Sequence, residues 1–233
     1  VQESRLRIGT PAYAGLVAEL TRRKCTLVRG APNRSGECLV AFVARKGHLR
    51  VRGPLSVGDP SRSLVVTWFP RGMQPVHVVN IYGDASGSRV AAESTDELLR
   101  AAHKELESLG RVPALICGDL NQELGTLGAA AGLMVSGWSD LGGGPTSVNA
   151  VSKRPRRIDV LVASPALLDR TMGGMASWDL ALPGHAYQWF DMGLAAVDRV
   201  PGWVKAKPLP LPSVGGPSRE VAWDGLRGLR ETF

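Results

Sequence analysis

One short apolar run constrains the fold of this chain more than any other feature. Residues 113–117 read Pro-Ala-Leu-Ile-Cys, a run that is too short for a helix and carries no charged side chain. Such a run is typical of a strand buried on both faces of a sheet. It ends at Gly118-Asp119, and residues 158–163 form a second apolar run with an acid, Asp159, near its start. The sequence therefore predicts a layered sheet protein with polar chemistry at its strand ends.

Other segments have the periodicity of helices or strands. Residues 11–23 begin with a proline and place apolar side chains on one helical face, which predicts a short amphipathic helix. Residues 94–109 carry Ser94 and Glu97 as a capping box, then an apolar stripe and a glycine stop, which predicts a second helix. Further strands are predicted at residues 37–45, 63–69 and 76–82.

Length and proline content indicate how the chain is divided. It has 233 residues, a length at which a large sheet protein still forms one domain. We expect that domain to span residues 1–200. Residues 201–233 contain five prolines and little periodicity, which predicts a Pro-rich basic linker or tail.

Charge and cysteine content narrow the function classes. The formal net charge of +7 favours capture of a polyanion such as nucleic acid, although a basic surface without a ligand is an equal alternative at this point. The three cysteines lack metal-ligand or disulfide spacing, so we expect small core residues in a reducing compartment. No apolar stretch approaches the length of a membrane span, so we expect an intracellular protein with no membrane partner.

Four separated segments carry residue patterns suited to chemistry. They are Val1-Gln2-Glu3-Ser4, Asn80-Ile81-Tyr82, Gly118-Asp119-Leu120-Asn121 and Arg157-Ile158-Asp159, and His185 follows them. Taken singly, each has an ordinary explanation: a surface acid, a half-buried aromatic, a tight turn, a strand-edge ion pair or a loop histidine. Their order and intervals favour a common explanation.

Together these segments resemble the endonuclease/exonuclease/phosphatase superfamily. The resemblance implies an α/β (α+β) fold, a four-layer sandwich of two packed, mostly antiparallel sheets flanked by helices. It implies a Mg²⁺ cofactor, for which Mn²⁺ can substitute, with Glu3 as a metal ligand. The catalytic positions that it implies are Tyr82, Asp119, Asn121, Asp159 and His185. Among these, Asp119 and Asn121 sit over the reacting phosphate, Tyr82 lies against it, and Asp159 orients His185.

The residue types suit that chemistry. A phosphodiester is anionic, so its hydrolysis needs a hard cation on a phosphate oxygen, an activated water and compensation of charge on the leaving oxygen. Asp119 and Asn121 are two residues apart at a strand end and can point the same way, with the acid accepting a proton and the amide fixing the water. An Asp159–His185 pair gives an imidazole of fixed tautomer that can bind phosphate or help deprotonate water.

Two features depart from the family pattern. Gly184 stands where the family has an acid directly before the histidine. The family's first strand, and the buried strand that leads into Glu3, have no counterpart in these residues, so we expect a domain that lacks its first strands.

The substrate is indicated by basic residues near the fourth motif. Arg154 and Arg156 lie in a basic run at residues 153–157, where they can hold backbone phosphates beside the cut, or simply be solvated. Asn80 and Thr146 are further expected substrate-binding residues. We expect the substrate to be nucleic acid, and DNA in particular, in the manner of a non-LTR retrotransposon endonuclease acting in the nucleus. The alternatives are a small-molecule phosphatase or phosphodiesterase of the same fold, and a catalytically degenerate domain that only binds nucleic acid.

Overall fold

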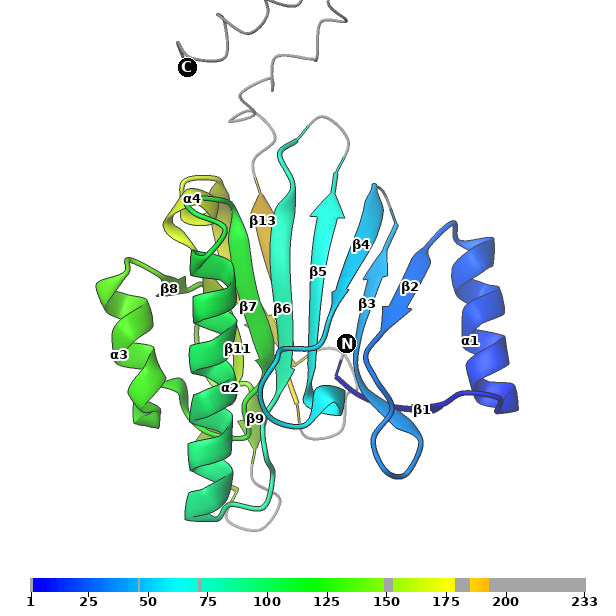
Figure 1. The fold of residues 1–233 in the computed structure, drawn as a ribbon, viewed down its shortest axis with the longest axis horizontal. Coiled ribbons are helices and arrows are strands. Elements are labelled where there is room, and N and C mark those ends of the chain that lie inside the picture. Colours follow the sequence, from blue (N-terminus) through cyan, green and yellow to red (C-terminus); the bar gives the residue numbers. More distant parts are fainter. Residues whose placement is uncertain (1, 46, 71–72, 149–152, 179–184, 193–233) are drawn as a thin grey trace, which may run out of the picture. The chain divides into compact units, whose positions relative to one another are not determined.

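The computed structural model describes residues 2–192 apart from 46, 71–72, 149–152 and 179–184. Its largest sheet has six strands in the order β4-β5-β6-β7-β11-β8 (Figure 1). These strands are β4 (His48–Gly53), β5 (Ser63–Phe69), β6 (Val76–Tyr82), β7 (Ala114–Asp119), β8 (Ser139–Asp140) and β11 (Asp159–Ala163). Neighbouring strands of this sheet pair antiparallel except β6 and β7, which are parallel.

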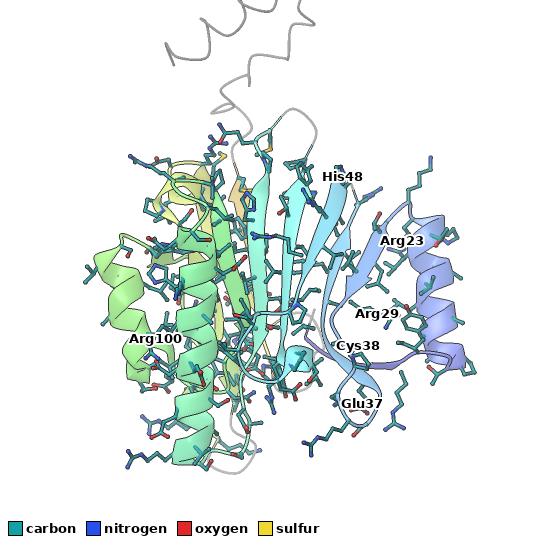
Figure 2. All side chains as sticks on the ribbon, viewed as in Figure 1. Arg23, Arg29, Glu37, Cys38, His48 and Arg100 are labelled. Atoms are coloured by element: carbon teal, nitrogen blue, oxygen red, sulfur yellow. The ribbon has the colours of Figure 1, made fainter. Side chains whose placement is uncertain are left out.

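Helices cover one face of this sheet. The parallel pair β6–β7 needs a crossover, which contains α2 (Arg89–Glu107), and α3 (Gly128–Val135) packs beside it. The apolar stripe of α2 faces the sheet, while Arg100 on its exposed side pairs with Asp96 at 2.5 Å (Figure 2). The core between helices and sheet is formed by buried side chains such as Val79, Ile81, Leu98, Leu99, Leu106, Ile116, Leu133 and Val162.

Smaller sheets cover the other face. One has the order β1-β3-β2, with β1 (Gln2–Arg7), β2 (Thr26–Arg29) and β3 (Glu37–Ala44), and α1 (Pro11–Arg22) packs beside β1 and β2. The other is the hairpin of β12 (Thr171–Ser177) and β13 (Tyr187–Met192). A second core of buried residues, including Val40, Leu64, Val66, Val78 and Leu115, lies on this face. Helix, sheet, sheet and helix therefore follow in layers, as expected for the α/β sandwich.

Short elements complete the described chain. They are η1 (Pro60–Arg62), η2 (Leu124–Thr126), β9 (Ser147–Val148), β10 (Pro155–Arg156) and α4 (Pro165–Leu168). Burial raises the pKa of the Cys117 thiol to about 11, so this thiol is neutral at pH 7. None of the helices within the described residues is long and apolar enough to cross a membrane.

Most predicted elements are present, and one predicted boundary is wrong. The strands predicted at 63–69 and 76–82 have those bounds in the structure. The helix predicted to begin at Ser94 begins at Arg89 instead, because the Ser88 hydroxyl accepts the Ala91 N–H at 3.1 Å and caps the helix one and a half turns earlier. Glu97 therefore lies inside α2 and belongs to no capping box. The predicted tail at 201–233 lies outside the described residues.

The register of the large sheet brings three motif positions into one row. In the parallel pair, Tyr82 lies opposite Asp119, so the carboxyl ends of β6 and β7 meet at the same edge. In the antiparallel pair, Asp119 lies opposite Asp159, the first residue of β11. The ends of β6 and β7 and the start of β11, which are far apart in the sequence, therefore lie side by side.

Candidate active site

Two carboxylates and one imidazole meet at this edge of the sheet. Asp119 closes β7 with only 3% of its surface exposed, and Asp159 opens β11 beside it. The imidazole of His185 joins them, and one ligand atom from each of the three residues lies within 4.8 Å of the other two. The convergence expected for Asp119, Asp159 and His185 is therefore present in the structure.

His185 is held by its backbone as well as by its ring. Its Nδ1 lies 3.0 Å from Oδ2 of Asp159. Its backbone forms an isolated antiparallel bridge with Ser147, and the next N–H, of Ala186, donates to the Thr146 carbonyl at 2.7 Å. These contacts tie the segment that carries the histidine to the hairpin that precedes Asp159. The neighbouring Gly184, which replaces the family's acid, lies outside the described residues.

Asn121 is fixed next to Asp119 by an unusual backbone conformation. Its φ angle is +55°, in the left-handed region that asparagine tolerates better than most residues. Its N–H donates to Oδ1 of Asp119 at 2.8 Å, and its Nδ2 donates to the Gly83 carbonyl at 3.1 Å. The Gly-Asp-Leu-Asn motif is thus a turn, and the turn presents an acid and an amide together at the strand end.

Gly83 connects the loop after Tyr82 to that turn. Its N–H donates to the Asp119 carbonyl at 2.7 Å. A Cβ atom at this position would collide with the backbone carbonyl of Leu120, so only glycine allows the two loops to come this close. The tyrosine loop and the aspartate turn therefore form one rigid junction.

The Thr146 hydroxyl holds the backbone at the start of β11, where Asp159 lies. Thr146 is fully buried, and its Oγ1 accepts the N–H groups of Ile158 at 3.1 Å and Asp159 at 2.9 Å. A substrate-binding role was expected for Thr146; in the structure its side chain is buried and its hydroxyl binds backbone N–H groups. Asn80, also expected to bind substrate, is 1% exposed and donates to the Ala41 carbonyl of β3 at 3.4 Å.

The basic run at 153–157 divides into three environments. The Arg157 guanidinium makes two hydrogen bonds to the Asp140 carboxylate, at 2.8 Å and 2.6 Å, so it is a strand-edge ion pair. Arg156 turns toward the active site, where its Nη2 donates to the Asn121 carbonyl at 3.1 Å and its Nε lies 4.0 Å from Glu123. Arg154 is exposed beside them. Arg156 thus helps to hold the turn of Asp119 and Asn121, a contact that residue types alone do not predict.

The donor set suits a divalent cation. Asp119 and Asp159 bring two carboxylates together, and a bound divalent cation would offset their mutual repulsion. Carboxylate oxygens suit Mg²⁺ and Mn²⁺, and the imidazole of His185 adds a nitrogen that Mn²⁺ accepts more readily than Mg²⁺. The expected ligand Glu3 lies in β1, and its side chain is outside the described residues.

One neighbouring residue was not predicted from the sequence. Arg62, at the end of η1, donates from Nη1 to the Gly83 carbonyl at 2.7 Å, and its Cζ lies 5.6 Å from the centre of the Tyr82 ring. It belongs to none of the motifs and lies 20 residues before Tyr82. Its contacts are with backbone oxygen and an aromatic face, which leave no residue-type pattern in the sequence.

Comparison with solved structures identifies the class of fold. No family model and no curated protein matches the sequence. The structure nevertheless matches proteins of the endonuclease/exonuclease/phosphatase class, and the described chain has that fold.

Three of the matching structures illustrate the likeness. The endonuclease domain of TRAS1, a telomere-specific non-LTR retrotransposon, is 18% identical with a TM-score of 0.56, over 77% of this chain and 91% of that one. The 3'-5' exonuclease NExo from Neisseria meningitidis is 19% identical with a TM-score of 0.58, over 82% of this chain and 87% of that one. An AP endonuclease from Archaeoglobus fulgidus is 18% identical with a TM-score of 0.59, over 82% of this chain and 87% of that one.

Proposed function

We propose that this protein is a metal-dependent phosphodiester hydrolase and that its substrate is DNA. The observation that carries the proposal is the meeting of Asp119, Asn121, Asp159 and His185 at one edge of the sheet, although they span 67 positions of the chain. A structural role alone does not account for two carboxylates and an imidazole packed this closely. Hydrolysis of an anionic ester does account for them.

Each residue has a role that its geometry supports. A bound Mg²⁺ or Mn²⁺ ion would withdraw charge from a phosphate oxygen and offset the charge of the leaving oxygen. Asp119, whose Oδ1 accepts the Asn121 N–H, orients and deprotonates the attacking water. The Asn121 amide fixes the water or the phosphate beside it. His185, with Nδ1 turned to Asp159, presents its other ring nitrogen to the phosphate.

Two further residues complete the proposed site. We keep Glu3 as an oxygen ligand of the ion, because β1 pairs with β3 on the sheet face next to β6. Tyr82 is paired with Asp119 in the parallel register and is 7% exposed, and we keep it as the residue that lies against the phosphate.

DNA is proposed as the substrate on two grounds. Arg154 is exposed and lies two residues before Arg156, which contacts the turn of Asp119 and Asn121, so positive charge lies close to the proposed site in the sequence. The fold likeness also includes the TRAS1 endonuclease domain and a Neisseria NExo structure bound to a product DNA hairpin. We infer from these that a retroelement-type endonuclease is the most suitable description.

A nicking assay tests the proposal. Supercoiled plasmid is incubated with the protein in Mg²⁺, in Mn²⁺ and in EDTA, beside an Asp119→Asn variant and soluble phosphomonoesters and phosphodiesters. Metal-dependent nicking that disappears in the variant supports the proposal. Turnover of the small esters without nicking identifies a small-molecule phosphatase. Plasmid binding without any cleavage identifies a degenerate binding domain.

A further inference from the structure

The guanidinium of Arg62 contacts the loop after Tyr82 from three directions. Its Nη1 donates to the Gly83 carbonyl at 2.7 Å and to the Tyr82 carbonyl at 3.4 Å. Its Cζ lies 5.6 Å from the centre of the Tyr82 ring, within the range of a cation–π contact. Its Nη2 lies 3.8 Å from Oδ2 of Asp84, and only 22% of the side chain is exposed. Arg62 is therefore packed into this loop, and most of its surface is removed from solvent.

The Gly83 carbonyl accepts hydrogen bonds from both Arg62 and the Asn121 side chain. It accepts Nη1 of Arg62 at 2.7 Å and Nδ2 of Asn121 at 3.1 Å. A carbonyl oxygen has two lone pairs, so these two donors can occupy both of them. The position of this one oxygen therefore depends on Arg62, and the direction of the Asn121 amide depends on the same oxygen.

We propose that Arg62 is a positioning residue of the active site: through the Gly83 carbonyl it sets the orientation of the Asn121 amide, and through the Tyr82 ring and carbonyl it sets the place of that tyrosine. The inference about catalysis rests on the proposed function, whereas the inference about orientation does not. Arg62 makes no contact with Asp119, Asp159 or His185 in the described structure, so it acts through its neighbours.

Arginine suits this task better than lysine. Its planar group can direct one nitrogen at the Gly83 carbonyl and another toward Asp84 while its flat face lies over the tyrosine ring. A lysine ammonium keeps the charge but can satisfy only part of this geometry. Arg62→Lys should therefore keep part, and not all, of the kcat that Arg62→Ala loses.

Kinetics test the catalytic part of the proposal. Arg62→Ala should lower kcat by roughly 10-fold to 100-fold, because a small displacement of a catalytic group has an effect of that order, and should leave KM within about threefold. Arg52→Ala is the matched control, since Arg52 pairs with Glu105 at 2.7 Å on the α2 side of the sheet and has 34% of its side chain exposed. A rise in KM with unchanged kcat would assign Arg62 to substrate contact and overturn the proposal.

A double-mutant cycle tests whether Arg62 acts through Asn121. In an Asn121→Ala background there is no amide left to orient, so Arg62→Ala should lower kcat further by less than about threefold, the part that passes through Tyr82. The same loss in both backgrounds would mean that the two residues act independently and would overturn the coupling.

An NMR measurement tests the orientation without any catalysis. In Arg62→Ala, the side-chain amide signals of Asn121 and the ring signals of Tyr82 should shift, and they should stay unchanged in Arg52→Ala. Unchanged Asn121 signals in Arg62→Ala would overturn the proposal. If the wild-type protein shows no metal-dependent cleavage, the proposed function fails, and this measurement still decides the role of Arg62.

Discussion

His185 Nδ1 lies 3.0 Å from Oδ2 of Asp159, across a gap of 26 residues in the chain. A carboxylate at this distance stabilises the charged imidazolium, so Asp159→Ala should lower the pKa of His185. An NMR titration of the histidine ring protons in wild type and variant measures the change.

Asp140→Ala is the matched control for this titration. Asp140 is an acid at the end of β8 whose partner is Arg157, at 2.6 Å. Its removal should leave the His185 titration unchanged. An identical His185 titration in wild type and Asp159→Ala would show that the contact contributes nothing to the charge state of the imidazole.

The second prediction concerns turnover. Asp119→Ala should reduce the rate of nicking by on the order of 10²–10⁴, because it removes the group that positions and deprotonates water. DNA affinity, measured by fluorescence anisotropy in Ca²⁺, should change little, since the basic residues stay in place. Equal loss of binding and cleavage would instead indicate that Asp119, which is 3% exposed, holds the fold together.

The third prediction reverses that pattern. Arg154 is exposed two residues before Arg156, so Arg154→Gln should weaken DNA binding and reduce the slope of log affinity against log salt by roughly 0.9 if one phosphate contact is lost. Turnover at saturating DNA should be unaffected. Arg34→Gln, at an exposed arginine before β3, is the control, and an equal change in both variants would mean that only net charge matters.

The sequence predicted the meeting of Asp119 and Asp159 better than it predicted the elements around them. Apolar strands that end in polar motifs identified Asp119 and Asp159, and the register places these two opposite each other. The missed elements have weak local signals. Strand β4 is mostly exposed at an edge, β12 contains Gly173 and Gly174, and α3 begins with a glycine, so neither alternation nor propensity marked them.

Motif membership also predicted which residues lie near the site better than it predicted which atoms they contact. Thr146 and Asn80 both belong to motifs near the site, but both are buried, and their polar groups bind backbone atoms. Arg62 makes the converse point, because it lies in no motif and contacts the site through a backbone carbonyl. Contacts to backbone atoms do not depend on a matching residue type, so they require the three-dimensional structure.

The fourth prediction follows from the junction at Gly83. A Cβ atom there would meet the Leu120 carbonyl, so Gly83→Ala should force the two loops apart and destabilise the fold by about 1–3 kcal/mol. The rate of cleavage should fall by more than the loss of folded protein accounts for, because Asn121 follows Leu120 directly. Gly87→Ala, in the same loop but with open space around it and a φ of +68°, separates backbone strain from collision. Comparable cleavage in both variants would contradict the junction.

The fifth prediction concerns the support beneath Asp159. The buried Thr146 hydroxyl accepts two N–H groups, from Ile158 and Asp159, so Thr146→Val should leave both buried donors unpaired while it preserves the shape of the side chain. Each unpaired group costs about 1–3 kcal/mol, which predicts a clear drop in the free energy of unfolding measured by urea denaturation. Thr146→Ser keeps the hydroxyl and loses only a methyl group, so it should retain most of the stability and most of the cleavage activity. Asp159 is the first residue of β11, so Thr146→Val should also weaken the contact between Asp159 and His185. Turnover should therefore fall at temperatures where the protein is still folded. A Thr146→Ser variant that is as unstable as Thr146→Val would show that packing of the methyl group, and not the hydroxyl, holds the start of this strand.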